Sequence, residues 1–125
     1  MTKYLCFLDF EATCESPEQI NINEIIEFPL ILTKYENNTL TEISRFHQYV
    51  KPTINPILSK FCTELTGIQQ KTVDTGNTIN IVLKEVTKWI NERVNQLNCS
   101  ENDIIFVTWG DWDLTTCLPN ECSRK

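Results

Sequence analysis

The stretch Tyr4-Leu5-Cys6-Phe7-Leu8-Asp9-Phe10 decides the fold, because it is apolar at nearly every position until an acid close to its end. A strand that is covered on both faces of a sheet has this composition. We therefore predict a buried strand over residues 4–10. Asp9 and the following Glu11 then lie at its carboxyl end.

Three more strands are expected, at 24–35, 43–50 and 104–108. The turn signal Asn37-Asn38 predicts that the second and third strands pair as a hairpin. Because Pro29 lies inside the second strand, we expect a bulge there or a position that needs no N–H.

Two helices lie between the third and fourth strands. Ser59 is suited to cap a short helix through Leu65, and Gly67 is suited to end it. Thr78 is suited to cap a long helix whose apolar residues recur every three or four positions. These residues are Ile79, Val82, Leu83, Val86, Trp89, Ile90, Val94 and Leu97.

A long helical crossover lets the strand at 104–108 lie parallel to the first strand, which gives a mixed α/β sheet. Chemistry in such sheets gathers at the carboxyl ends of the parallel strands. Asp9 and Glu11 follow one of these strands, and Asp111 and Asp113 follow the other. A last short helix is expected after this second pair, ended by Pro119.

Composition narrows the class of protein. The chain has 125 residues, of which 41% are hydrophobic, so we expect one globular domain. No apolar run approaches a membrane span, and the N-terminus reaches an acid too early for a signal peptide. We therefore expect an intracellular protein, in cytoplasm or nucleus, without a membrane partner.

The six cysteines form no CxxC pair and only one histidine is present, so a structural zinc site is poorly supported. The net charge of −6 argues against an ordinary nucleic-acid-binding face. It does not exclude a nucleic-acid enzyme that holds metal ions between carboxylates.

The acids have two interpretations. Asp9 and Glu11 are two residues apart, so both face one pocket, where they repel each other unless a hard cation such as Mg²⁺ lies between them. Asp113 could complete a two-ion site that acts on a phosphodiester. The alternatives are a solvated pair of acids at a strand end, and an aspartate, Asp111 or Asp113, that only caps the next helix.

Five strings occur in the order found in the DEDDh 3′–5′ exonucleases, and the chain resembles the branch of that family with the histone-mRNA and enhanced-RNAi exonucleases. The strings are Phe7-Leu8-Asp9-Phe10-Glu11-Ala12-Thr13-Cys14, Glu24-Ile25-Ile26-Glu27-Phe28-Pro29, Phe46-His47-Gln48-Tyr49-Val50-Lys51-Pro52, Leu58-Ser59-Lys60-Phe61-Cys62-Thr63-Glu64-Leu65-Thr66-Gly67-Ile68 and Trp109-Gly110-Asp111-Trp112-Asp113-Leu114. The resemblance extends from Tyr4 to Cys122.

The resemblance implies a ribonuclease H-like fold and an enzyme that trims single-stranded RNA from its 3′ end. Nucleoside monophosphates are then released with two Mg²⁺ or Mn²⁺ ions, and DNA is a less favoured substrate. The resemblance assigns the metal-binding and catalytic acids to Asp9, Glu11 and Asp113. It places the terminal nucleotide against Ala12, Thr13, Leu65, Thr66 and Trp112.

The chain departs from the family pattern at its C-terminus. The family needs a general-base histidine and a fourth aspartate on a C-terminal helix, and this chain ends at Lys125. We therefore expect residues 1–125 to be the N-terminal two-thirds of a single exonuclease domain, without the last strand and C-terminal helix. His47 and Glu27 are expected to have structural roles, with His47 away from the acids. The alternative is a catalytically inactive module that binds nucleic acid or protein.

Overall fold

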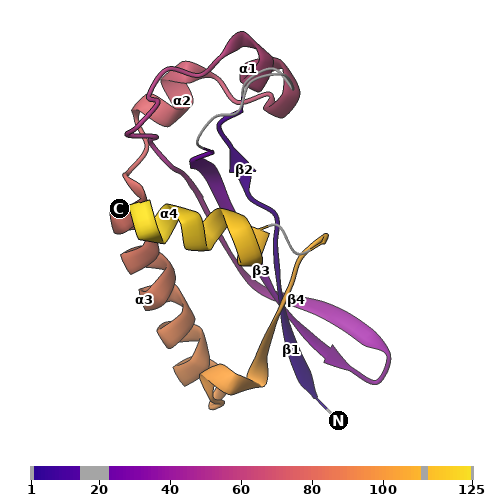
Figure 1. Ribbon diagram of the computed structural model, residues 1–125. Helices are drawn as coiled ribbons and strands as arrows, with labels where there is room; N and C mark the ends of the chain where they lie inside the picture. The colour runs from indigo at the N-terminus through magenta and orange to yellow at the C-terminus, as the bar shows by residue number, and fades with distance from the viewer. Residues whose placement is uncertain (1, 15–22, 111–112, 125) are drawn as a thin grey trace.

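The computed structural model describes residues 2–14, 23–110 and 113–124. The chain forms a five-stranded mixed sheet with helices on one face and at one end (Figure 1). The elements in chain order are β1 Lys3–Leu8, β2 Glu11–Ala12, β3 Ile25–Glu36, β4 Thr39–Tyr49, α1 Lys60–Thr66, α2 Gln70–Asp74, α3 Ile79–Leu97, the 3₁₀ helix η1 Glu101–Asp103, β5 Ile104–Val107, the π-helical turn η2 Asp113–Cys117 and α4 Leu118–Arg124.

The long strand β3 organises the sheet. It pairs antiparallel with β4 on one side, and with β1 and then β2 on the other. β5 lies parallel to β1, with Tyr4 opposite Ile104 and Phe7 opposite Val107. The predicted mixed α/β sheet and the parallel pairing are therefore confirmed.

Alternation along the strands separates two faces. Cys6 and Leu8 of β1 and Leu30 of β3 are buried against α3, in one core with Val82 and Val86. Figure 1 shows α3 and α4 on this face, while α1 and α2 lie at the end of the sheet near β2. A second, smaller core of Ile26, Leu58, Cys62, Ile68 and Val73 joins that end of the sheet to α1 and α2.

The helix signals are confirmed at their predicted positions. The Ser59 hydroxyl accepts a hydrogen bond from the Cys62 N–H at 3.0 Å and so caps α1. Gly67 ends α1 with a φ of 76°, which a glycine adopts without steric cost. Thr78 precedes α3 as expected, although its side chain makes no capping hydrogen bond.

Three expectations need correction. The first strand ends at Leu8 and a separate strand begins at Glu11, although both keep one register against β3, with Leu8 opposite Leu30 and Glu11 opposite Glu27. This register places Pro29, which has no N–H to donate, opposite the break. A bulge lies between Leu32 and Thr33 of β3 and not at Pro29, which pairs directly with His47 of β4, so the other expectation for Pro29, a position that needs no N–H, is the one that remains.

The last correction concerns Pro119, which does not end the last helix. It is the second residue of α4. In the first turn of a helix an N–H has no intrahelical acceptor, so proline is tolerated there. The sequence also gave no separate signal for the short helix α2.

Candidate metal centre

Phe10 fixes the directions of its two acidic neighbours. Its side chain is 5% exposed and packs against the ring of Phe28, with centroids 4.5 Å apart. Burial of this ring turns Asp9 and Glu11 away from the core, and Asp9 is exposed while Glu11 is half-buried in β2. The predicted arrangement, a core phenylalanine between two outward acids, is present.

Asp113 reaches the same place from the other end of the chain. Its Oδ2 accepts a hydrogen bond from the Phe10 N–H at 2.9 Å, across 103 residues of sequence. Burial raises the pKa of Asp113 above its ordinary value, the bond from Phe10 lowers it in part, and the negative charge of Asp9 raises it again. Asp113 therefore lies beside the segment that carries Asp9 and Glu11, as a shared site would require.

The pKa of Glu11 shows the effect of the neighbouring negative charges most clearly. Burial raises its pKa above the ordinary value, and the charges of Asp9, Glu27 and Asp113 raise it further. Each of these neighbours is negative, so Glu11 lies in an electrostatic environment that favours a cation. Asp111 and Trp112 of the same motif lie outside the described residues.

Glu27 and His47 form a feature that the sequence reasoning missed. Glu27 lies directly opposite Glu11 in the β2–β3 ladder. The Nε2 atom of His47 is 2.7 Å from the Oε2 atom of Glu27. The pairing of β4 with β3 thus brings His47 against Glu27, and among the described residues its contact is with this acid and not with Asp9, Glu11 or Asp113. The sequence predicts a structural role for Glu27 but not its contact with His47.

The donor set fits Mg²⁺ or Mn²⁺ by its chemistry, since carboxylate oxygens are the ligands these hard ions prefer. Within residues 2–14, 23–110 and 113–124, however, no three acidic, histidine or cysteine side chains converge closely enough to hold a metal ion as they stand. One oxygen of Asp113 is held by Phe10, and Glu27 is held by His47. The acids therefore lie close enough to influence one another electrostatically, but their side chains would have to rotate before their oxygens could bind one ion.

The segment after Glu11 is fixed by α1. The Ser59 hydroxyl donates to the Cys14 carbonyl at 2.6 Å, and the Cys62 thiol lies 3.7 Å from the Ala12 carbonyl. Thr13 is buried, and its hydroxyl accepts from the Glu24 N–H at 2.8 Å. These hydrogen bonds therefore hold the predicted nucleotide-contacting segment against the start of α1.

The other predicted contacts lie at the far end of α1. Leu65 is 67% exposed. The Thr66 hydroxyl donates to the Cys62 carbonyl at 2.8 Å and accepts from the Ile68 N–H at 3.1 Å. Leu65 thus offers an open apolar surface, whereas Thr66 helps to end the helix.

A buried carboxylate holds the loop that leads to α1. Glu24 is fully buried and accepts hydrogen bonds at 2.7–3.1 Å from three consecutive N–H groups, those of Thr53, Ile54 and Asn55. Charge-assisted bonds of this kind offset the cost of burying the acid. Sequence pattern alone gave no indication of this contact.

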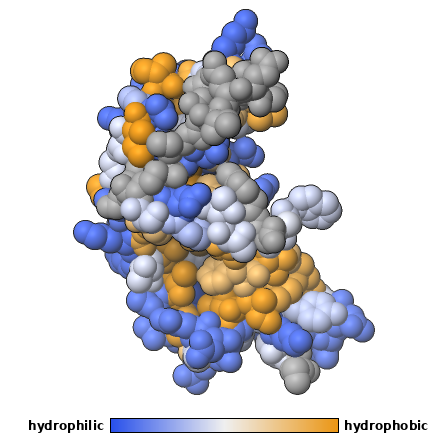
Figure 2. Space-filling model, viewed as in Figure 1, coloured by the Kyte–Doolittle hydropathy of each residue, from blue (hydrophilic) through white to orange (hydrophobic). Residues whose placement is uncertain are grey.

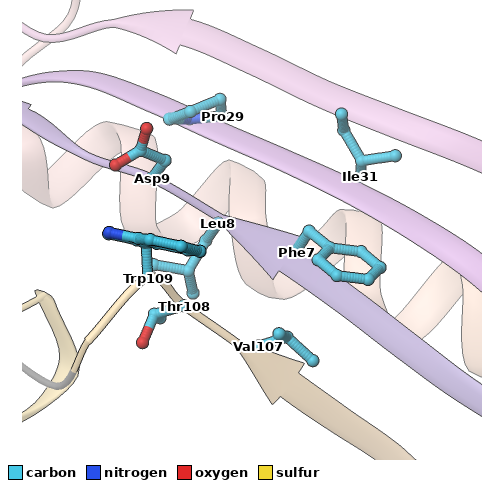
Figure 3. A pocket seen from close by; sticks show the side chains of 8 residues that line it. All are labelled: Phe7, Leu8, Asp9, Pro29, Ile31, Val107, Thr108 and Trp109. Carbon is cyan, nitrogen blue, oxygen red and sulfur yellow. The ribbon is translucent and has the colours of Figure 1, made fainter.

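Asp9 also lies at the rim of an apolar hollow of about 450 Å³ on the sheet face away from α3. Figure 3 shows Phe7, Ile31 and Val107 at one end of this hollow, with Asp9 and Trp109 at the other. Trp109 is 98% exposed. The candidate metal centre therefore adjoins an open apolar surface.

Known exonucleases are similar to this chain over almost its whole length. The model of the RNase_T family, described as "Exonuclease", matches residues 6–125. ERI1 exoribonuclease 3 of Homo sapiens is 47% identical over 120 residues, which are 95% of this chain and 34% of that protein. The 3′-5′ exonuclease Snipper of Drosophila melanogaster is 40% identical in an alignment 134 residues long, which covers 98% of this chain and 47% of that protein.

Among solved structures, the nuclease domain of 3′hExo, described as a DEDDh family member bound to rAMP, superposes with a TM-score of 0.85. Its sequence is 40% identical, and the match covers 98% of this chain and 59% of that one. The chain belongs to the RNase_T exonuclease family, and the predicted resemblance to the DEDDh exonucleases is confirmed. It spans less than half the length of the two relatives named above. In the part of the chain that the structure describes, no helix combines the length and apolarity needed to cross a bilayer.

Proposed function

We propose that this chain is the N-terminal two-thirds of a divalent-metal-dependent 3′–5′ exoribonuclease domain that removes nucleoside monophosphates from single-stranded RNA. The observation that carries the proposal is the hydrogen bond from the Phe10 N–H to Asp113. It brings the third family acid to the other two, where the pKa of Glu11 already reflects all three neighbouring negative charges. The names of the matched relatives support an exonuclease over an inactive binding module.

Asp9, Glu11 and Asp113 would hold two Mg²⁺ or Mn²⁺ ions. Bound there, such ions activate a water molecule and stabilise the leaving oxygen of a phosphodiester. The protein supplies the placement: Phe10 fixes Asp9 and Glu11 through its buried ring, and fixes Asp113 through its N–H. In this proposal the acids act as ligands and orient the scissile phosphate.

The terminal nucleotide would lie beside the 12–13 segment and the C-terminal end of α1. Ala12 and Thr13 would contact it from one side and Leu65 and Thr66 from the other, while the Ser59 hydroxyl joins the two segments at the start of α1. Trp112 is proposed to stack on the base, a contact worth about 1–3 kcal/mol with any base. The solved relatives support RNA as substrate, since one is described with rAMP and another with a histone mRNA stem-loop.

The test uses a single-stranded RNA of 20 or so nucleotides with a 5′ fluorescent label and the full chain in Mn²⁺ buffer. Because the general-base histidine of the family is not among residues 1–125, we expect shortening by single nucleotides from the 3′ end at a rate about 10²–10⁴-fold below that of a domain that has this base, with nucleoside monophosphate as the released product. Asp9→Asn should abolish it, whereas Glu101→Gln, which removes an exposed acid from η1, should not. A matching single-stranded DNA measures the sugar preference. Internal cleavage, or shortening that survives Asp9→Asn, would contradict the proposal.

A further inference from the structure

Glu27 is placed where it could disturb the metal-binding acids. It lies directly opposite Glu11 across the β2–β3 ladder. Opposed residues of antiparallel strands have their Cβ atoms about 5 Å apart, and like charges in such a pair repel. The charge of Glu27 does raise the pKa of Glu11. A fourth carboxylate is thus within reach of the cluster formed by Asp9, Glu11 and Asp113.

His47 contacts the Glu27 carboxylate from β4, on the side of β3 opposite to β2. On β4, His47 pairs with Pro29, so it lies diagonally from Glu27 on the same face of the sheet. Its Nε2 atom is 2.7 Å from Glu27 Oε2. The ring is itself held edge-on by Tyr49, with centroids 4.8 Å apart and planes at 87°. Tyr49 is the residue that pairs with Glu27 across β3 and β4.

We propose that His47 is a positioning residue that holds the Glu27 carboxylate on the β4 side of the sheet. This leaves Asp9, Glu11 and Asp113 as the acids available to a divalent cation, and it limits the direct repulsion between Glu27 and Glu11. The inference rests on the proposed metal site. It adds that His47 determines which carboxylates are available to the metal ion.

The first test measures Mn²⁺ affinity by the loss of the free-ion electron paramagnetic resonance signal, with the full chain and no RNA. His47→Ala frees Glu27 to join the site, so affinity should rise about three- to tenfold, as an added charged ligand does in other oxygen-ligand sites. His47→Gln keeps an N–H donor at the end of its side chain and should bind as the parent chain does. In the double variant His47→Ala/Glu27→Gln, the gain should disappear.

A matched control separates position from charge. Arg45 lies two residues before His47 on β4, and its partner is Glu42, outside the cluster. Arg45→Gln therefore removes a positive charge from the same face without freeing Glu27, and the Mn²⁺ affinity should not change. Equal affinity in the parent chain and His47→Ala would overturn the inference. An equal rise in His47→Ala and His47→Gln would overturn it as well, because only charge would then matter.

A second test needs no metal. If His47 holds Glu27 away from Glu11, then Glu11→Gln should raise Tm at least about twice as much in the His47→Ala background as in the parent background. Equal shifts in the two backgrounds would overturn the inference even if the chain binds no Mn²⁺. A different result would contradict the proposed function: either the parent chain does not bind Mn²⁺, or it binds Mn²⁺ and Asp9→Asn does not weaken that binding.

Discussion

Two regions of the sheet differ in how much of their surface the described residues cover. They are the closed end, around residues 24–26 at the start of β3, and the open end, along β5. Around β3, Ile25 and Ile26 are fully buried between the sheet and its helices, and Glu24 is covered by three N–H groups. On β5, Ile105 is 49% exposed and Phe106 is 41% exposed, although they point to opposite faces. Only β1 pairs with β5 among the described residues.

The open end carries apolar surface on both faces. On the face away from α3 lies the hollow beside Asp9. On the other face, a second apolar hollow of about 200 Å³ lies among residues of α3, α4 and β5. Figure 2 shows apolar surface gathered below α4, between α3 and β5. The closed end therefore supplies most of the fold's own packing, while the open end holds Asp9 and Asp113 beside uncovered apolar groups.

The sharpest test of this difference compares two isoleucines. Ile25→Ala removes a fully buried side chain of the main core, so the free energy of unfolding should fall by about 2–5 kcal/mol. Ile105→Ala removes a half-exposed side chain of β5 and should cost less than about 1 kcal/mol. Urea unfolding measures both. Equal costs would mean that β5 is packed as tightly as β3.

A smaller effect is expected at Gly76, at the closed end. A Cβ built there would lie 2.7 Å from the Tyr49 carbonyl oxygen, a backbone atom. Gly76→Ala should therefore destabilise the chain by about 1–3 kcal/mol. Gly67→Ala is the control, because a Cβ there meets nothing within 4 Å and only the φ of 76° opposes it. Its expected cost is about 1 kcal/mol, and a larger cost at Gly67 than at Gly76 would contradict the packing described.

The smallest effect is electrostatic and concerns Glu11, which lies in β2 opposite Glu27. The pKa of Glu11 is raised in the folded chain, so the folded state binds more protons than the unfolded state above the ordinary glutamate pKa of about 4.3. Stability is lost as pH rises through the interval between the unfolded and folded pKa values, and the cost is fully present above it. In metal-free buffer at neutral pH, Glu11→Gln should stabilise the chain by less than about 1 kcal/mol, and the gain should vanish below about pH 4.

Glu42→Gln serves as the control for that titration. Arg45 lowers the pKa of Glu42, so its removal should give no gain at neutral pH. Thermal unfolding at pH 3.5, 5 and 7 follows both variants. A gain from Glu11→Gln that is constant across this range would exclude the repulsion between acids as its cause.

Local sequence patterns predicted much of the fold and part of the candidate site. The apolar run of β1, the cap at Ser59 and the periodicity of α3 are local, so spacing and residue type predicted them. The prediction that β1 is covered on both faces is wrong, because only Cys6 and Leu8 of this strand are buried and Phe7 lines the hollow beside Asp9. The resemblance selected Asp113, and its bond with Phe10 agrees with that selection.

What pattern missed depends on contacts between segments that are distant in sequence. The pair of Glu27 with His47 requires the register of β3 against β4. The enclosure of Glu24 requires the path of the loop at 53–55. Pro119 was misplaced because the same residue that ends a helix is also accepted in its first turn.

The central claim is that acids from the two ends of the chain form one cation site, and Asp113 is the residue that tests it most directly. Titration with Mn²⁺ should show saturable binding by the parent chain, and Asp113→Asn should weaken it about tenfold or more, equivalent to about 1.4 kcal/mol. Glu101→Gln, which removes an equal charge from η1, should bind as the parent chain does. Equal Mn²⁺ affinity of Asp113→Asn and the parent chain would contradict the account.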